Sequence, residues 1–72
     1  MDNSKYRGTI VKMEHFRERE FCARGVRYGF IRYNLDYNDF LFNGIDGEKL
    51  LNVTNNDAMV TEAVEVAYGR QF

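Results

Sequence analysis

Aromatic residues stand two positions apart in two short stretches near the middle of the chain, at residues 28–33 and 39–42. On a strand, successive side chains point to opposite faces of the sheet. Pairing of two such strands would place four rings and one arginine on a single surface, made of Tyr28, Phe30, Arg32, Phe40 and Phe42. Whether that surface binds a ligand or forms the core is the main question that the sequence raises.

The hydrophobic pattern predicts four strands. Residues 25–33 and 39–42 contain the two aromatic stretches. Residues 6–13 include three consecutive β-branched side chains, which suit a pleated sheet, and this strand can reach residue 16. Residues 61–68 alternate between valines and other residues, which predicts the last strand.

Turn or loop signals separate these predicted strands. Residues 34–38 are rich in Asn and Asp, and the pairs Asn43-Gly44 and Asp46-Gly47 are typical of turns. Residues 14–24 contain a run of alternating charge at residues 17–20, which indicates a long hairpin with a charged tip, a mobile loop or, as a third choice, one helical turn. Residues 48–59 predict a loop with room for a short turn of helix. Four to five short strands with little helix indicate a small all-β barrel or sandwich.

Composition and charge place the chain among small globular proteins. Its 72 residues allow one domain over residues 1–72, and 44% are hydrophobic. Six phenylalanines and five tyrosines exceed the needs of so small a core, so we expect exposed rings. Residues 1–36 carry eight basic and five acidic side chains, whereas residues 37–72 carry two and six. The basic half suits phosphate groups, although scattered charges also describe an ordinary solvated surface.

Cys22 and His15 are the single residues of their kinds, which limits the chemistry open to the chain. A lone cysteine forms no internal disulfide and indicates a reducing compartment. A zinc site built from Cys and His is excluded, and no orienting group accompanies Cys22 for nucleophilic catalysis. We therefore expect a protein that is not an enzyme and that uses no metal or cofactor.

No apolar run is long enough to span a bilayer, and the first residues lack the hydrophobic core of a secretion signal. The sequence therefore predicts a soluble protein in the cytoplasm that makes no contact with a membrane.

Four stretches resemble the cold-shock domain family. Tyr28-Gly29-Phe30-Ile31 is similar to the family signature Phe-Gly-Phe-Ile, and Asp39-Phe40-Leu41-Phe42 is similar to Val-Phe-Val-His, with Phe42 at the histidine position. Residues 8–13 and 61–66 are similar to the family's first and fourth strands. The resemblance covers roughly two thirds of the chain. It implies a five-stranded antiparallel OB-type barrel that binds single-stranded RNA or DNA.

The chain also departs from the family pattern. Lys12 stands where the family has a tryptophan in the first strand, and Val26-Arg27 replaces a basic residue followed by glycine. The loop after the first strand is longer than usual. Few residues follow Gly69, so residues 48–54 or another chain would have to close the barrel.

Two functions are predicted for the aromatic surface. In the first, single-stranded nucleic acid, RNA in preference to DNA, stacks its bases on the rings at about 1–3 kcal/mol per base while basic side chains contact phosphates. The residues predicted to do so are Lys12, Arg27, Tyr28, Phe30, Arg32, Phe40 and Phe42. The alternative is a protein-interaction or oligomerisation module whose aromatic face docks a partner protein or a second copy. The acidic second half of the chain favours this alternative.

Overall fold

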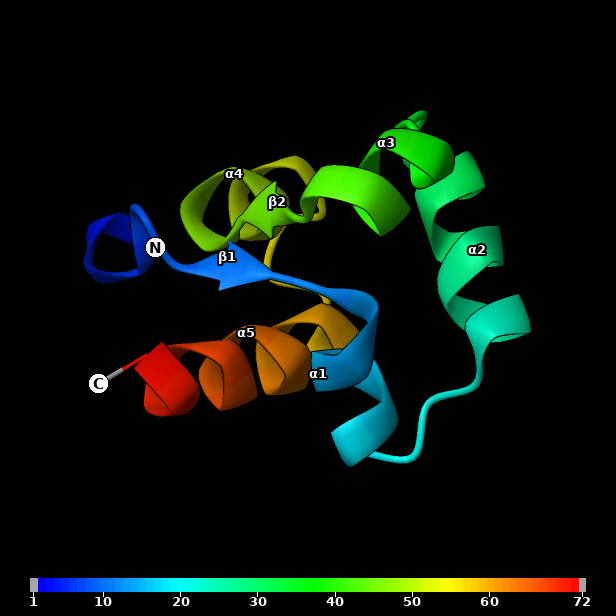
Figure 1. Ribbon diagram of the computed structural model, residues 1–72. Helices are drawn as coiled ribbons and strands as arrows, with labels where there is room; N and C mark the ends of the chain where they lie inside the picture. Colours follow the sequence, from blue (N-terminus) through cyan, green and yellow to red (C-terminus); the bar gives the residue numbers. More distant parts are fainter. Residues whose placement is uncertain (1, 72) are drawn as a thin grey trace.

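The chain folds mainly into helices, as Figure 1 shows for the computed structural model, which describes residues 2–71. Its elements in chain order are the 3₁₀ helix η1 (Ser4–Tyr6), β1 (Ile10–Val11), α1 (Met13–Glu18), α2 (Ala23–Arg32), α3 (Tyr37–Asn43), β2 (Ile45–Asp46), α4 (Gly47–Val53) and α5 (Ala58–Gln71). The predicted all-β barrel is therefore wrong. So is the resemblance to the cold-shock family, because it implied an OB-type fold.

Helix α2 replaces the predicted strand at residues 25–33. Val26 and Phe30 are buried and lie four residues apart, so they fall on one side of a helix. Tyr28 and Arg32, which a strand would place beside Phe30, lie on the exposed side instead. The period of 3.6 residues, rather than the period of two, describes this segment.

Helix α5 replaces the predicted strand at residues 61–68 and carries the longest buried stripe. The stripe follows helical spacing through Val60, Ala63, Val64 and Ala67. Asp57 caps the start of α5, because its Oδ1 accepts the backbone N–H groups of Met59 at 2.9 Å and Val60 at 3.3 Å. Of the two alternating valines that predicted a strand, Val64 belongs to this stripe, whereas Val66 is only partly buried.

Helices α3 and α4 also begin at aspartates, in segments that the sequence predicted as strand, turn or loop. The Asp36 side chain accepts the backbone N–H of Asp39 at 3.0 Å, and the Asp46 side chain accepts that of Lys49 at 3.1 Å. Each aspartate therefore acts as a helix N-cap. The predicted strand at residues 39–42 lies inside α3.

Of the strand predicted at residues 6–13, only Ile10–Val11 is a strand, and its partner β2 lies at residues 45–46, where the sequence predicted turns. β1 and β2 pair antiparallel, with Val11 opposite Ile45. Gly44 ends α3 at a φ of 75° and lies against β1. A Cβ there would come within 2.6 Å of Ile10 Cγ2 and 2.9 Å of the Val11 carbonyl oxygen, so only glycine fits. Of the two predicted turn pairs, Gly44 ends a helix but Asn43 belongs to it, and Asp46-Gly47 joins β2 to α4.

An aromatic cluster joins α1, α2 and α3. Phe40 of α3 lies between Phe30 of α2, at 4.4 Å between ring centroids, and Phe16 of α1, at 5.9 Å. Tyr37 packs against both Phe30 and Phe40. These contacts attach α2 and α3 to the rest of the molecule. In Figure 1, α2 stands at the end of the molecule opposite the two chain ends.

Candidate binding surface on helix α2

The outer side of α2 combines arginines with apolar side chains. Spacings of three and four residues place Arg24, Arg27, Tyr28 and Ile31 on the side opposite the buried stripe, and Arg32 lies at its edge. Tyr28 is 68% exposed and Ile31 is 62% exposed. Large apolar groups therefore meet water between positive charges.

The arginines of α2 differ from most of those elsewhere in the chain. Arg7 binds Glu48, Arg19 binds Glu62 and Arg70 binds Glu18, and in each pair the acid raises the pKa of the arginine. Within residues 2–71, by contrast, no ion pair involves the three arginines of α2, which are Arg24, Arg27 and Arg32. Their charges face solvent and are available to a partner.

Helix α3 extends this surface. A shallow depression, whose lining also includes Leu35 and the carboxylate of Asp36, connects Arg27 and Ile31 of α2 with residues 37–38 at the start of α3. One helical turn further along, α3 exposes Leu41 and Phe42, and Phe42 is 86% exposed. We call this region the α2–α3 surface; it consists of Arg24, Arg27, Tyr28, Ile31, Arg32, Leu41 and Phe42.

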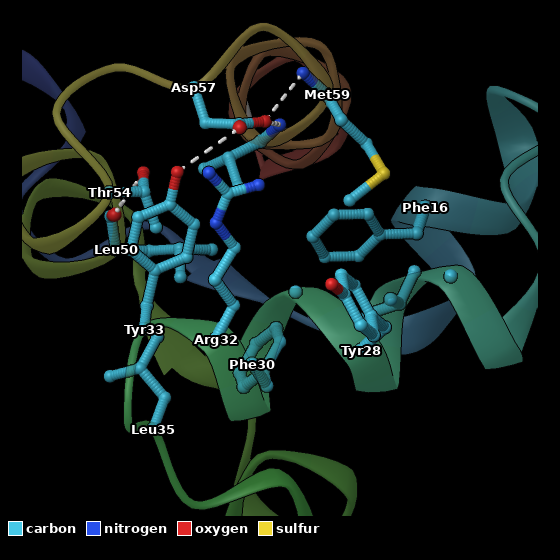
Figure 2. A pocket seen from close by; sticks show the side chains of 14 residues that line it. Phe16, Tyr28, Phe30, Arg32, Tyr33, Leu35, Leu50, Thr54, Asp57 and Met59 are labelled. Carbon is cyan, nitrogen blue, oxygen red and sulfur yellow. Dashed lines mark hydrogen bonds between the residues drawn. The ribbon is translucent and has the colours of Figure 1, made fainter.

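A pocket of about 220 Å³ opens at the other edge of α2, between this helix and the turn that connects α4 with α5 (Figure 2). Its floor includes the core side chains of Phe16, Val26 and Leu50. Less buried residues form its rim: Gly25, Tyr28, Gly29, Arg32, Tyr33, Asp57 and Met59. The pocket is thus a mainly apolar hollow with one cationic side chain at its edge.

The two charged side chains of the rim, Asp57 and Arg32, differ in their hydrogen-bond and ion-pair partners. Asp57 accepts two backbone N–H groups as the cap of α5, and it also accepts the Tyr33 hydroxyl at 3.4 Å. Its charge therefore lies at a helix N-terminus, where negative charge is stabilised. Figure 2 shows the Arg32 side chain extending from α2 toward Asp57 and Tyr33, while Met59 lies beside Phe16. No ion pair with Arg32 forms among residues 2–71.

The structure brings together only part of the predicted site. Arg27, Tyr28 and Arg32 share the exposed side of α2, and Phe42 lies on the outside of α3. Lys12 stands apart from them, just before α1, where its backbone N–H donates to His15 Nδ1 at 2.8 Å.

Two of the predicted rings belong to the core. Phe30 is 3% exposed and Phe40 is 1% exposed, so a base cannot stack on either ring in the folded protein. The aromatic surface expected from paired strands is therefore not formed. This correction follows from the helical geometry, which buries Phe30 and exposes Tyr28 two residues before it.

Several residues of the surface and pocket were missed in the sequence. Arg24, Ile31 and Leu41 became apparent only with the helical period. The useful signal was the spacing of three and four residues from Arg24 through Arg27 and Tyr28 to Ile31. No local signal predicted the pocket, because its walls come from segments far apart in the chain.

Two kinds of site are not found among the described residues: a metal-binding cluster and a membrane-spanning helix. Within residues 2–71, no group of three His, Cys, Asp or Glu side chains is arranged to hold a metal ion. A membrane-spanning helix would need greater length and apolarity than any helix among these residues has. No protein-family model matches the chain, and no curated protein or solved structure matches it significantly.

Proposed function

We propose that this chain is a protein-interaction module that binds an acidic, partly apolar segment of a partner protein across the α2–α3 surface. One observation carries the proposal. Three arginines without ion-pair partners among residues 2–71 flank exposed apolar side chains on a single helix, whereas Arg7, Arg19 and Arg70 are paired. This combination of charges and apolar groups suits a segment that presents both carboxylates and hydrophobic side chains.

The composition of the surface supports a protein partner. Arginine and tyrosine are enriched among the residues that contribute most to protein–protein binding energy. Exposed Ile31, Leu41 and Phe42 supply apolar area whose removal from water favours association. Arginines that are desolvated in such an interface need carboxylates opposite them, so the partner segment is acidic.

Binding of single-stranded nucleic acid is the second candidate. The same three arginines can contact phosphates, and Tyr28 is exposed enough to stack on a base. Phe42, which is 86% exposed, can also stack on a base, but this function uses less of the surface, because Ile31 and Leu41 have no role in binding a base or a phosphate. The predicted stacking positions Phe30 and Phe40 are also buried.

The proposal concerns binding rather than catalysis. Cys22 is a free and exposed thiol. An exposed thiol stays reduced most readily in a compartment such as the cytoplasm, which supports the predicted location.

Titration of the labelled protein, followed by NMR, tests the proposal. One probe is an acidic peptide that alternates glutamates with leucines and phenylalanines, and the second is a single-stranded RNA oligomer. We expect saturable shifts of α2 and α3 amides with the peptide, and weak, strongly salt-dependent shifts with the RNA. RNA binding tighter than peptide binding at physiological salt would favour the second candidate and contradict the proposal.

A charge-reversal pair provides the control. Arg24→Glu with Arg27→Glu is expected to abolish peptide binding. Lys12→Glu with Arg17→Glu makes the same change of charge at two exposed positions, just before and within α1, outside the α2–α3 surface, and is expected to leave binding intact. Equal loss in both variants would mean that only the net charge of the protein matters.

A further inference from the structure

The size of the pocket beside α2 restricts what it can hold. At about 220 Å³ it is smaller than the usual range of small-molecule sites, roughly 300–1,000 Å³. It is larger than an engineered protein cavity of about 150 Å³ that binds benzene. A single aromatic or large aliphatic side chain matches this size, whereas a nucleotide or a cofactor is too large.

Two glycines keep the α2 wall of the pocket open. Gly25 and Gly29 are four residues apart on the same side of the helix, and both line the pocket. A Cβ at Gly29 would lie 3.7 Å from Met59 Cε, and one at Gly25 would lie 3.8 Å from Cys22 Sγ, which are ordinary contacts. Neither glycine has a positive φ.

Neither packing nor backbone conformation therefore requires glycine at these two positions. Glycine inside a helix is destabilising compared with alanine. What the pair provides is space, because each missing methyl group enlarges the hollow between α2 and the start of α5.

The charged side chains at the rim indicate which partner residue would lie next to a side chain that enters the pocket. Asp57 is already satisfied by backbone N–H groups and by the Tyr33 hydroxyl. Arg32 has no ion-pair partner within residues 2–71, and it lies on the helix that also carries Arg24 and Arg27. A carboxylate next to the inserted side chain would therefore complement Arg32.

We propose that this pocket receives one aromatic or large aliphatic side chain of the acidic partner segment and that Arg32 pairs with a carboxylate beside it. The inference rests on the proposed function and makes it more specific. It names the anchor residue of the partner, because buried side chains that fill pockets contribute most to the affinity of an interface.

A pair of peptides tests the anchor. Both contain six glutamates, and one has phenylalanine at its centre where the other has alanine. With the wild-type protein, we expect the phenylalanine peptide to bind at least tenfold more tightly, by calorimetry or fluorescence anisotropy. Gly25→Ala with Gly29→Ala is expected to remove most of this difference and to leave the weaker, salt-dependent binding of both peptides.

Gly69→Ala is the matched control variant. Gly69 lies in α5, has no atoms within 4 Å of the added Cβ and does not line the pocket. It gains the same helix-favouring methyl group, so it separates a change in the pocket from a change in helix stability. We expect it to retain the tenfold preference for phenylalanine.

The possible results distinguish the inference from the proposed function. If neither peptide binds, both the function and the anchor are contradicted. If both bind equally well to the wild-type protein, the acidic partner remains but the anchor is overturned. If phenylacetate alone binds the pocket more tightly than the phenylalanine peptide, the pocket serves a small molecule, which also overturns the anchor.

Discussion

Ion pairs of arginine distinguish two regions of the molecule, with the exception that Arg17 of α1 also forms no ion pair within residues 2–71. In one, ion pairs join segments that are 41 to 52 residues apart in the chain, through Arg7, Arg19 and Arg70. In the other, the arginines of α2 join nothing within residues 2–71. The first region links segments that are distant in the chain, whereas the arginines of the second region remain available to a partner.

The aromatic residues divide in the same way. Phe30 and Phe40 hold α2 and α3 against α1, whereas Tyr28 and Phe42, two residues away from each, face solvent. A side chain that contributes to binding therefore lies close in sequence to one that contributes to stability. Neighbouring positions on these helices can be substituted to separate the two roles.

The largest effect is expected from Phe40→Ala. Removal of this buried ring should cost about 3–5 kcal/mol, a large fraction of the roughly 5–15 kcal/mol that stabilises a typical domain. Phe42→Ala, on the same helix, should change stability by less than about 0.5 kcal/mol, because the ring is exposed. Urea denaturation measures both. Similar losses in the two variants would contradict the division between core and surface.

Two glycine substitutions are expected to change stability in opposite directions, by smaller amounts than Phe40→Ala. Gly44→Ala should destabilise the fold by more than about 1 kcal/mol, because its φ is positive and the Cβ would collide with β1. Gly29→Ala should stabilise the fold by about 0.5–1 kcal/mol, because α2 gains helix propensity without a collision. Thermal denaturation gives both signs. A destabilising Gly29→Ala would indicate that this glycine has a structural role.

These cases also show how much the sequence could predict. Local chemistry predicts only small parts correctly: residues 10–11 are extended within the strand expected over residues 6–13, and Gly44 ends an element. The three aspartates that begin α3, α4 and α5 were interpreted as turn residues. Asn and Asp favour turns and helix N-caps alike, so the choice between them depends on whether the next residues of the chain form a helix.

The helical spacing of buried residues in α2 is also hard to recognise in the sequence, because it depends on the structure of neighbouring segments. Two glycines and several β-branched or aromatic residues weaken its intrinsic helix propensity. Tertiary packing of Val26 and Phe30 decides in favour of the helix, and a single sequence does not display that packing. The pocket depends on α2, α4 and α5 together, so no local pattern could reveal it.

Asp46 tests whether polar contacts stabilise the first region. Its side chain accepts the N–H groups of Gly8 at 2.6 Å and Lys49 at 3.1 Å. Asp46→Ala should therefore cost about 1–2 kcal/mol through loss of the α4 cap and this link.

Arg24→Ala with Arg27→Ala is the matching test in the second region. It should leave stability within about 0.5 kcal/mol while weakening the binding of the acidic peptide. Urea midpoints and peptide titrations on the same samples provide the comparison. Loss of stability in the arginine variant would mean that these side chains stabilise the fold after all.

The smallest effect concerns acid pH. The hydrogen bond from Arg70 holds the pKa of Glu18 below its ordinary value of about 4.3. A carboxylate with a depressed folded-state pKa contributes stability above its unfolded-state pKa and loses it as the pH falls through the folded-state value. Urea midpoints should therefore fall less steeply below about pH 4.3 in Glu18→Gln than in the wild-type protein. Because the pair is exposed, the difference is expected to be small and to shrink in high salt.

Arg27→Ala is the control. It should leave the fall of stability at acid pH unchanged, since this arginine has no acidic partner within residues 2–71. A flatter acid limb in Arg27→Ala would reveal a carboxylate that pairs with α2 in solution, and the charges of the two regions would then not differ as the structure indicates.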